Sequence, residues 1–200
     1  ILAVEAGAAY LGVVMVPESP RSVSVDEVRR IREGIDVPLI LVTADRDPAE
    51  VARDARALDA WGLQLHGDES PEDVARLREA GAWKVWKAIR VRAADDLADA
   101  IERFAGQVDA LHLDGWHPSR LGGTGVRFPW DDVAGIRDRL PEGTGLVAAG
   151  GLNAENVARV VDLLRPDVVD VSSGVEVRPG IKDPEKVRAF VRSATGVATA

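Results

Sequence analysis

Short apolar runs alternate with charged, amphipathic segments along almost the whole of this 200-residue chain, and this alternation restricts the fold more than any other feature. Seven runs have the length and composition of buried parallel strands, at residues 10–16, 37–42, 61–65, 83–89, 108–113, 145–149 and 168–171. Segments with the 3.6-residue periodicity of helices lie at 25–34, 48–58, 71–80, 93–104, 130–140, 154–164 and 184–194. A strand–helix unit therefore repeats every ~25–30 residues, which is the span of a βα unit.

Several helical segments begin with recognisable capping sequences. DPAE at 47–50, SPED at 70–73 and DPEK at 183–186 each set a capping residue before a proline. The chain itself opens differently, because ILAVEAG is typical of the end of an amphipathic helix, with Gly7 as its C-cap. We therefore expect a further segment before Ile1 in the natural protein.

Strict βα alternation leaves two main architectures, a doubly wound open sheet and a closed (β/α)8 barrel. Polar or glycine-rich stretches follow five of the seven strands: PESPR, HGDES, DGWHPSRLGGTG, GGL and SSGVE. Loops of this kind crowd the C-terminal face of a barrel, whereas an open sheet gathers its site at one switch point. We predict a single α/β domain over residues 1–200, a (β/α)8 TIM barrel that is N-terminally incomplete because its first β-strand is missing from the sequence as given.

Composition excludes several classes of function. The net charge of −8 and the pI of about 5.0 argue against a nucleic-acid-binding face. The absence of cysteine rules out disulfides, thiolate metal sites and a cysteine nucleophile within these residues. No apolar run approaches the ~18 residues that cross a membrane, and no signal-peptide pattern is present. We expect a cytoplasmic protein with neither a nucleic-acid nor a membrane partner.

Two glycine-rich turns in the last third of the chain are typical of a phosphate site. One is Gly-Gly at 150–151, before a helix with Asn153 as its expected N-cap, and the other is Ser-Ser-Gly at 172–174. Glycines allow close backbone approach, and hydroxyls and helix N-termini favour anions. In barrels, the loops after strands 7 and 8 often bind phosphate, and the two turns take those places once a strand is added at the front. Each alone is equally well explained as a tight turn, but the pair favours phosphate.

A lone carboxylate stands at the end of another strand. In LHLDGWHPSRLGGTG, at 111–125, Asp114 closes an apolar run and precedes a glycine-rich loop. Packing gives no reason for a carboxylate there, whereas an acid or base at the mouth of a barrel is explained by catalysis. The alternative is that Asp114 is an exposed loop cap.

In their order, these motifs resemble those of the phosphoribosylanthranilate isomerase family, the barrel enzymes of tryptophan biosynthesis. The matching segments cover nearly the whole chain: GVVMVPESPRSVS at 12–24, LQLHGDE at 63–69, LDG…GGTGVRFPW at 113–130, AGGLNAENV at 149–157 and VDVSSGVEVRPGIKD at 169–183. Any one motif is weak, but the ordered set is specific. The resemblance implies an isomerase that performs an Amadori rearrangement of N-(5-phosphoribosyl)anthranilate to the 1-deoxyribulose 5-phosphate aminoketose, with no metal and no organic cofactor.

The resemblance also implies roles for individual residues. Asp114 would be the general acid that opens the sugar ring, and partial burial among apolar neighbours would keep it protonated. Arg21 would pair with the anthranilate carboxylate, because its guanidinium fork matches that group. The segment 122–125, including Gly123, would form a mobile loop beside the acid.

The expected phosphate site is lined by Gly150, Gly151, Asp170, Ser172, Ser173 and Gly174. The carboxylate of Asp170 would repel phosphate, so we expect a backbone or structural role there. His66 is as readily a structural histidine as a substrate contact, and Gln64 is expected inside the barrel or next to the substrate. We interpret His112 and His117 as structural.

The sequence departs from the family pattern at two places. The first strand of the family carries Lys-Ile-Cys-Gly, whose cysteine is the general base, and neither is present here. The strand could be absent from the sequence as given, which would leave the chain itself inactive, or another base or a binding function could have replaced it. At 128–130, Phe-Pro-Trp replaces Phe-Asp-Trp, and Pro129 is expected to begin the next helix.

Two other functions stay open. The first is another phosphosugar enzyme, either the histidine-pathway aminoaldose isomerase or indole-glycerol-phosphate synthase. The synthase would show lysines at strand ends, but here Lys84 and Lys87 share one strand and only Lys87 could point into a barrel. The histidine-pathway enzyme would show catalytic aspartates on two strands and a two-fold repeat, and we find neither in the sequence. The second is a non-catalytic phosphosugar-binding barrel. The expected partner in each case is a small phosphosugar, and the protein would be a monomer or a homodimer.

Overall fold

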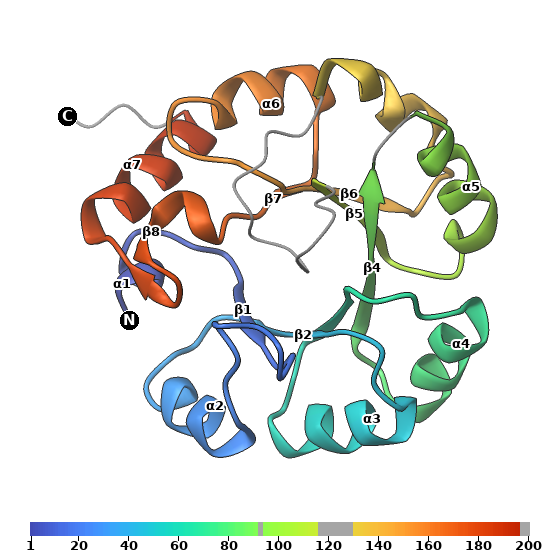
Figure 1. Cartoon of the computed structure of the whole chain (residues 1–200), viewed down its shortest axis with the longest axis horizontal. Coiled ribbons are helices and arrows are strands. Elements are labelled where there is room, and N and C mark those ends of the chain that lie inside the picture. Colours follow the sequence, from blue (N-terminus) through green and yellow to red (C-terminus); the bar gives the residue numbers. More distant parts are fainter. Residues whose placement is uncertain (92–93, 116–129, 197–200) are drawn as a thin grey trace.

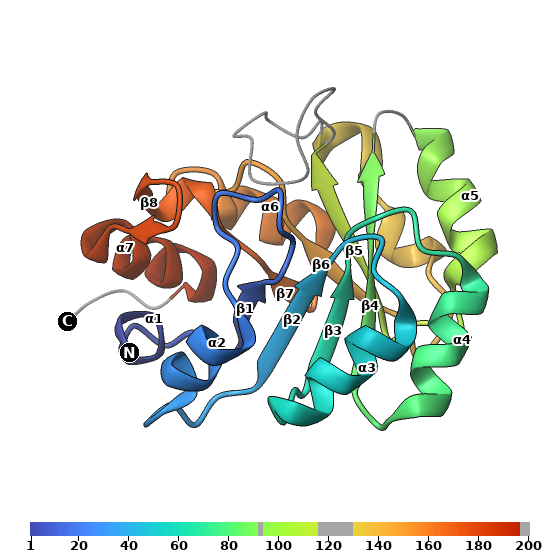
Figure 2. The same ribbon diagram turned by 60° about the horizontal axis from the view of Figure 1, so that its bottom comes forward.

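A parallel sheet of seven strands curls around a central space, and the helices pack along its outer side (Figure 1). This computed structural model describes residues 1–91, 94–115 and 130–196. The strands are β1 Leu11–Val14, β2 Leu39–Thr43, β3 Gly62–Leu65, β4 Lys84–Val91, β5 Ala110–Gly115, β6 Gly145–Ala148 and β7 Val168–Val169. Each strand pairs in parallel with the next one along the chain, as the sequence alternation predicts. Their arrows point toward one end of the molecule, where the loops after the strands gather (Figure 2).

The helices begin and end close to where the sequence places them. They are α1 Leu2–Glu5, α2 Val25–Arg32, α3 Pro48–Ala57, α4 Pro71–Ala80, α5 Ala94–Phe104, α6 Val157–Leu164 and α7 Pro184–Thr195. The three predicted proline starts are confirmed, and the side chains of Asp47, Ser70 and Asp183 accept hydrogen bonds from backbone N–H groups of the first turns. Helix α1 ends at the C-cap Ala6, and Gly7 follows with a positive φ of 99°.

Two predicted helices were wrong in detail. The segment 130–140 forms two short 3-10 helices, η1 Trp130–Val133 and η2 Ile136–Arg139, because Gly135 between them adopts a left-handed conformation with φ 79°. The helix predicted over 154–164 begins only at Val157, and Asn156 is its N-cap. The expected N-cap, Asn153, instead closes the preceding turn by accepting hydrogen bonds from the backbone N–H groups of residues 155 and 156.

A short hairpin after β7 was not predicted. It consists of β8 Glu176–Arg178 and β9 Ile181–Lys182, which pair antiparallel after the 3-10 helix η3 Ser173–Val175. Pro-Gly at 179–180 supplies the turn, and Gly180 takes a positive φ of 81°.

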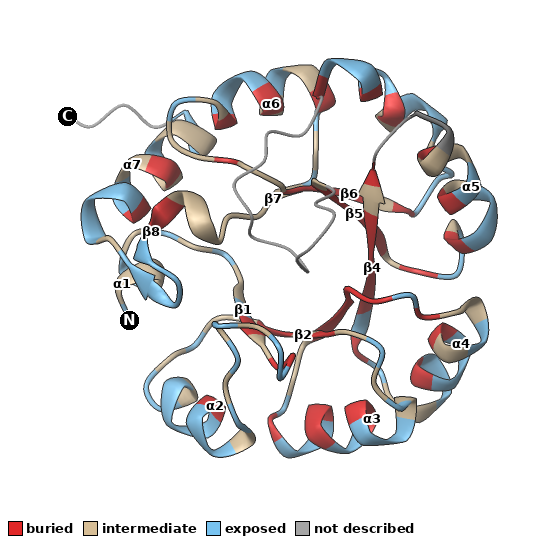
Figure 3. Ribbon diagram, viewed as in Figure 1, coloured by how far each residue is buried: buried red, intermediate tan, exposed pale blue. Residues whose placement is uncertain are grey.

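The core has an outer and an inner part. Outward-facing strand residues such as Leu63, Leu111 and Leu146 are fully buried against the helices, and the helix faces toward the sheet are buried as well (Figure 3). Inside the curl, a separate apolar cluster contains Ile40, Trp86, Ala110 and Val147, packed against Tyr10, Trp61 and Val168. Because side chains alternate along a strand, this inner cluster identifies which residues of each strand face inward.

Strands β1 to β7 form one sheet, and its edge strands are β1 and β7. An eighth strand between these edges would close the barrel, and its presence stays a prediction. Among residues 1–91, 94–115 and 130–196, no helix combines the length and the apolar character needed to cross a membrane.

Candidate active site

Several polar side chains point into the curl at the ends of the strands. In the parallel register, Gln64 of β3 pairs with Trp86 of β4, which pairs with Ala110 of β5, so these three residues face the same inner side. Two-residue alternation then places His66 and Asp114 on the inner side as well. The predicted acid therefore lies at the C-terminal mouth of the sheet, and it is buried rather than an exposed loop cap.

Asp114 is held by a chain of hydrogen bonds that starts inside the sheet. The amide nitrogen of Gln64 lies 2.9 Å from Nδ1 of His66, and Nε2 of His66 lies 3.0 Å from Oδ2 of Asp114. The other carboxylate oxygen accepts a hydrogen bond of 2.8 Å from the backbone N–H of Gly115. The three side chains come from β3, from the residue after it and from β5, so the curl of the sheet brings them together.

The surroundings of Asp114 differ from the sequence expectation. Burial raises its pKa, but the hydrogen bond and charge of His66, the charge of His112 and the Gly115 N–H outweigh burial and hold the pKa below its ordinary value. The condition for a protonated Asp114, burial among apolar neighbours, is not met, because two imidazoles line this part of the inner face. In the free protein the group is a carboxylate.

Arg21 lies in the loop after β1 and forms an ion pair with Glu176, a partner that the sequence analysis did not predict. Its Nε and Nη2 donate to Oε1 and Oε2 of Glu176 at 2.9 and 2.6 Å. Glu176 also accepts hydrogen bonds from Nζ of Lys182 and from the N–H of Gly180. Burial raises the pKa of Glu176, but the bonds from Arg21 and Lys182 lower it, so it stays ionised. Within the described chain, Nη1 of Arg21 has no hydrogen-bond partner.

The two glycine-rich turns lie side by side after β6 and β7. Gly150 and Gly151 have positive φ angles of 84° and 70°, which favour glycine. A Cβ on Gly150 would stand 2.4 Å from the backbone nitrogen of Gly115, and one on Gly174 would stand 1.9 Å from the carbonyl oxygen of Leu152. These glycines therefore let the turns approach each other and the residue after Asp114.

The serines of the second turn stand beside a cation. Ser172 is the N-cap of η3, which begins at Ser173, and the carbonyl of Ser172 accepts a hydrogen bond of 3.0 Å from Nζ of Lys182. This lysine was not identified from the sequence, because only the unpredicted hairpin brings it to the turn. Phosphate binding by these residues stays a prediction.

Asp170 directly follows β7, and its side chain contacts His112 on the inner face. Its Oδ2 lies 3.2 Å from Nε2 of His112, on the inner face of β5. Although the side chain of Asp170 is 46% exposed, desolvation by the protein around it raises its pKa, whereas the bond and charge of His112 and the charges of His66 and Lys182 lower the pKa below its ordinary value. The backbone N–H of Asp170 donates to the carbonyl of Ala148, which continues the ladder with β6.

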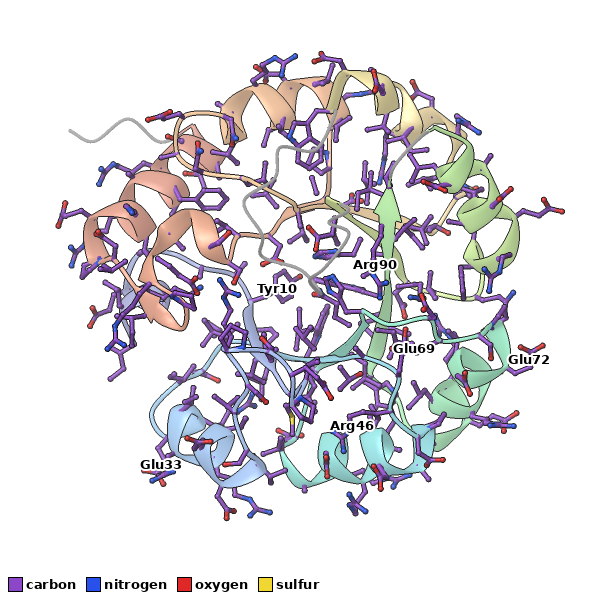
Figure 4. All side chains as sticks on the ribbon, viewed as in Figure 1. Tyr10, Glu33, Arg46, Glu69, Glu72 and Arg90 are labelled. Atoms are coloured by element: carbon purple, nitrogen blue, oxygen red, sulfur yellow. The ribbon has the colours of Figure 1, made fainter. Side chains whose placement is uncertain are left out.

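Lys87 points away from the inner space, and the expectation that it could point inward was wrong. It pairs in register with Leu65 and Leu111, which face the outer core, and its ammonium group lies 3.1 Å from the Glu69 carboxylate. Figure 4 shows Glu69 on the outer side of the sheet and Arg90 on its inner side. Arg90, which the sequence analysis missed, shares the inward parity of Trp86 and donates to the carbonyl of His66 at 3.0 Å.

The predicted loop at 122–125, with Gly123, and His117 lie outside the described residues. Within the described part of the chain, no three His, Cys, Asp or Glu residues are grouped so that they could hold a metal ion.

Comparison with known proteins gives consistent matches over the whole chain. The family model for N-(5'-phosphoribosyl)anthranilate (PRA) isomerase matches residues 1–193. The N-(5'-phosphoribosyl)anthranilate isomerase of Citrifermentans bemidjiense is 42% identical over 203 aligned positions, which cover 99% of this chain and 92% of that protein. The crystal structure of the phosphoribosylanthranilate isomerase from Thermotoga maritima superposes with a TM-score of 0.88 at 33% identity, covering 98% and 92% of the two chains. A structure of such an enzyme in complex with reduced 1-(o-carboxyphenylamino)-1-deoxyribulose 5-phosphate gives a TM-score of 0.85 at 32% identity, with the same coverage.

Proposed function

The chain belongs to the N-(5'-phosphoribosyl)anthranilate isomerase family, and from this premise we propose how its residues carry out the reaction. The protein is an isomerase of tryptophan biosynthesis that converts N-(5'-phosphoribosyl)anthranilate into the 1-deoxyribulose 5-phosphate aminoketose. One observation supports the proposed site most directly. The buried carboxylate of Asp114 and the glycine-rich turns after β6 and β7 lie at the same end of the sheet, and Gly150 almost touches Gly115. A phosphosugar anchored at the turns would place its ring next to Asp114.

Asp114 is the proposed general acid. The reaction needs a proton on the furanose ring oxygen, so that the C1–O bond breaks and the amine nitrogen forms an iminium. Asp114 is ionised in the free protein, but a substrate with a phosphate and a carboxylate adds negative charge and excludes water. Both effects raise the pKa of a neighbouring carboxyl group, so substrate binding would bring the proton to Asp114.

A base must then remove the proton from C2, so that a C1–C2 double bond forms and the iminium nitrogen becomes a neutral amine. Loss of the C2 hydroxyl proton and addition of a proton at C1 then give the ketose. The cysteine that the resemblance implies for this step has no counterpart among these 200 residues. The eighth strand that would carry it stays a prediction. His66 would keep Asp114 in place during both steps, because the Gln64 amide donates a hydrogen bond to the opposite nitrogen of the His66 ring.

The two ends of the substrate would be held by different loops of the mouth, the anthranilate end by the loop after β1 and the phosphate end by the turns after β6 and β7. Arg21 is the proposed ligand of the anthranilate carboxylate, since Glu176 occupies Nε and Nη2 and leaves Nη1 available. Gly150, Gly151, Ser172, Ser173 and Gly174 are the proposed phosphate ligands. We further propose that residues 1–200 belong to one barrel domain, which acts in the cytoplasm as a monomer or homodimer without nucleic-acid or membrane partners.

The test is turnover and binding measured on the same preparations. Proton NMR follows the C1 methylene of the ketose product, and calorimetry measures affinity for the reduced product analogue named above. We expect Asp114→Asn to lose nearly all turnover and to keep most of its affinity for the analogue. Asp138→Asn, which alters a carboxylate paired with Arg165 on the surface, is the control and should behave as wild type. Binding without turnover in these 200 residues would mean either that the base is missing or that the barrel only binds its ligand, and survival of turnover in Asp114→Asn would refute the acid assignment.

A further inference from the structure

A second imidazole–carboxylate pair lies on the inner face and has no part in the mechanism above. His112 of β5 is only 1% exposed, and its Nε2 lies 3.2 Å from Oδ2 of Asp170, whose side chain is 46% exposed. A carboxylate oxygen can only accept, so Nε2 carries the proton that is shared with Asp170. The pair therefore has one end fixed in the core and the other end open to solvent at the mouth of the sheet.

The strand register places Asp170 level with Asp114, two strands away in the same sheet. Leu113, Ala148 and Val169 are neighbours in adjacent strands, so Asp114 and Asp170 are the next residues along β5 and after β7. Strands are about 4.8 Å apart, and two strand spacings put the two backbones about 10 Å apart. Two carboxylates that both face inward are therefore separated by the width of β6.

The two pairs also touch each other. The rings of His66 and His112 meet edge to face, with centroids 5.7 Å apart. His112 thus lies between the hydrogen-bonded chain of Asp114 and the carboxylate of Asp170. A substrate that fills the mouth would contact the exposed end of each pair.

Packing alone does not account for His112. Its Nδ1 is buried and has no hydrogen-bond partner in the described chain, which a leucine at this position would avoid. Within the described chain, the His112 ring makes one hydrogen bond, to the half-exposed carboxylate of Asp170. The imidazole therefore fixes the orientation of the Asp170 side chain.

We propose that Asp170 accepts a hydrogen bond from a hydroxyl group of the substrate's sugar, and that His112 is the positioning residue that holds Asp170 for this contact. The inference rests on the proposed function. Asp170 stands two residues before Ser172, the first residue of the proposed phosphate turn. A phosphosugar held there would bring the hydroxyls between its phosphate and its reacting carbon next to Asp170. A carboxylate accepts hydrogen bonds from hydroxyls and repels phosphate, so its turn toward His112 suits the sugar rather than the phosphate.

The experiment uses four variants and the reduced product analogue as the binding probe. Asp170→Asn and His112→Leu are each expected to weaken binding of the analogue and to lower kcat/KM by about tenfold or more, as expected for hydrogen bonds to charged groups. His112→Gln should stay within about threefold of wild type, because its amide nitrogen can replace Nε2 as donor to Asp170. The double variant His112→Leu/Asp170→Asn should bind no more weakly than Asp170→Asn alone, because the two residues act through one contact.

Each outcome decides the proposal. Wild-type affinity in Asp170→Asn would overturn it, and so would additive losses in the double variant, because a merely structural histidine would act independently of Asp170. If His112→Leu fails to fold, the affinities of His112→Gln and Asp170→Asn for the analogue still test the proposal, because only the second should be weakened. A wild-type protein that neither binds the analogue nor turns over substrate would overturn the proposed function itself, and that result is visible before any variant is made.

Discussion

Nε2 of His66 lies 3.0 Å from Oδ2 of Asp114, and the opposite ring nitrogen of the same histidine faces the Gln64 amide nitrogen at 2.9 Å. An amide nitrogen only donates, so Nδ1 of His66 accepts and Nε2 carries the proton that points at Asp114. Gln64 therefore determines which tautomer of His66 meets the candidate acid. This contact is also a main reason why Asp114 is ionised in the free protein.

Replacing His66 by leucine should raise the pKa of Asp114. The substitution removes the His66 hydrogen bond, which lowers this pKa, and it leaves burial, which raises it. The acid form then persists to higher pH, so the descending limb of the kcat/KM profile should move upward while the maximum rate falls. The measurement is the pH dependence of kcat/KM, and Asp68→Asn, which changes an exposed carboxylate of the same loop, is the control. A profile that stays in place in His66→Leu would contradict the coupling.

The parts of the fold that follow from local sequence were predictable. The start of α3 follows from neighbouring residues alone, because Asp47 caps the helix and Pro48 is its first residue. Asp114 follows an apolar run, and this order predicted its place at the C-terminal end of a strand. Contacts between distant residues were not predictable. The partner of Arg21, Glu176, is 155 positions away, in a hairpin that no apolar run in the sequence predicts.

The sequence also did not show which face of each strand points into the curl of the sheet. Alternation shows that Lys87 and Trp86 face opposite sides of β4, but it does not say which side is inside. The inner cluster of Trp86 and Ala110 answers that question, and the answer excludes Lys87 from the site. The same information was needed to find His112 and Asp170 together, because they come from strands that are not adjacent.

Arg21→Met should affect only substrates that carry the aromatic carboxylate. We expect the KM for N-(5'-phosphoribosyl)anthranilate to rise by about tenfold or more, the size of one hydrogen bond to a charged group. For an analogue in which aniline replaces anthranilate, KM should change little, because the group that Arg21 would bind is absent. Steady-state kinetics with both substrates makes the comparison. An equal rise for both would show that Arg21 acts by tying the rim to Glu176 rather than by binding substrate.

Gly150→Ala should reduce both stability and turnover, whereas Gly143→Ala should reduce stability alone. The two glycines have nearly the same positive φ, 84° and 85°, so alanine is strained to a similar extent at each position. A Cβ on Gly150 would also press within 2.4 Å of the nitrogen of Gly115, next to Asp114, while a Cβ on Gly143 meets nothing within 4 Å. Urea unfolding and kcat, measured on both variants, separate the two effects. Equal kcat values in the two variants would mean that the close approach at Gly150 does not serve the site.

Lys87→Met should destabilise the protein strongly, because Lys87 is half of a buried ion pair. Its Nζ lies 3.1 Å from Glu69, and both side chains are almost fully buried. Nζ also donates to the carbonyls of Leu65 and Gly67, on either side of His66. Burial lowers the pKa of Lys87, and the charge of Glu69 works against this shift, so each charge depends on the other. Removing the ammonium leaves the Glu69 carboxylate uncompensated, and we expect a loss of about 3 kcal/mol in the free energy of unfolding at pH 7.

The double variant Lys87→Met/Glu69→Gln should recover part of that loss, because it leaves no unpaired charge while an amide oxygen still faces the N–H groups of Asp45 and Gly67. Urea unfolding of the two variants beside wild type measures the difference. A catalytic lysine of the synthase type would behave in the opposite way, with turnover abolished and the unfolding midpoint unchanged. That result would contradict the outward placement of Lys87 and reopen the second phosphosugar reaction.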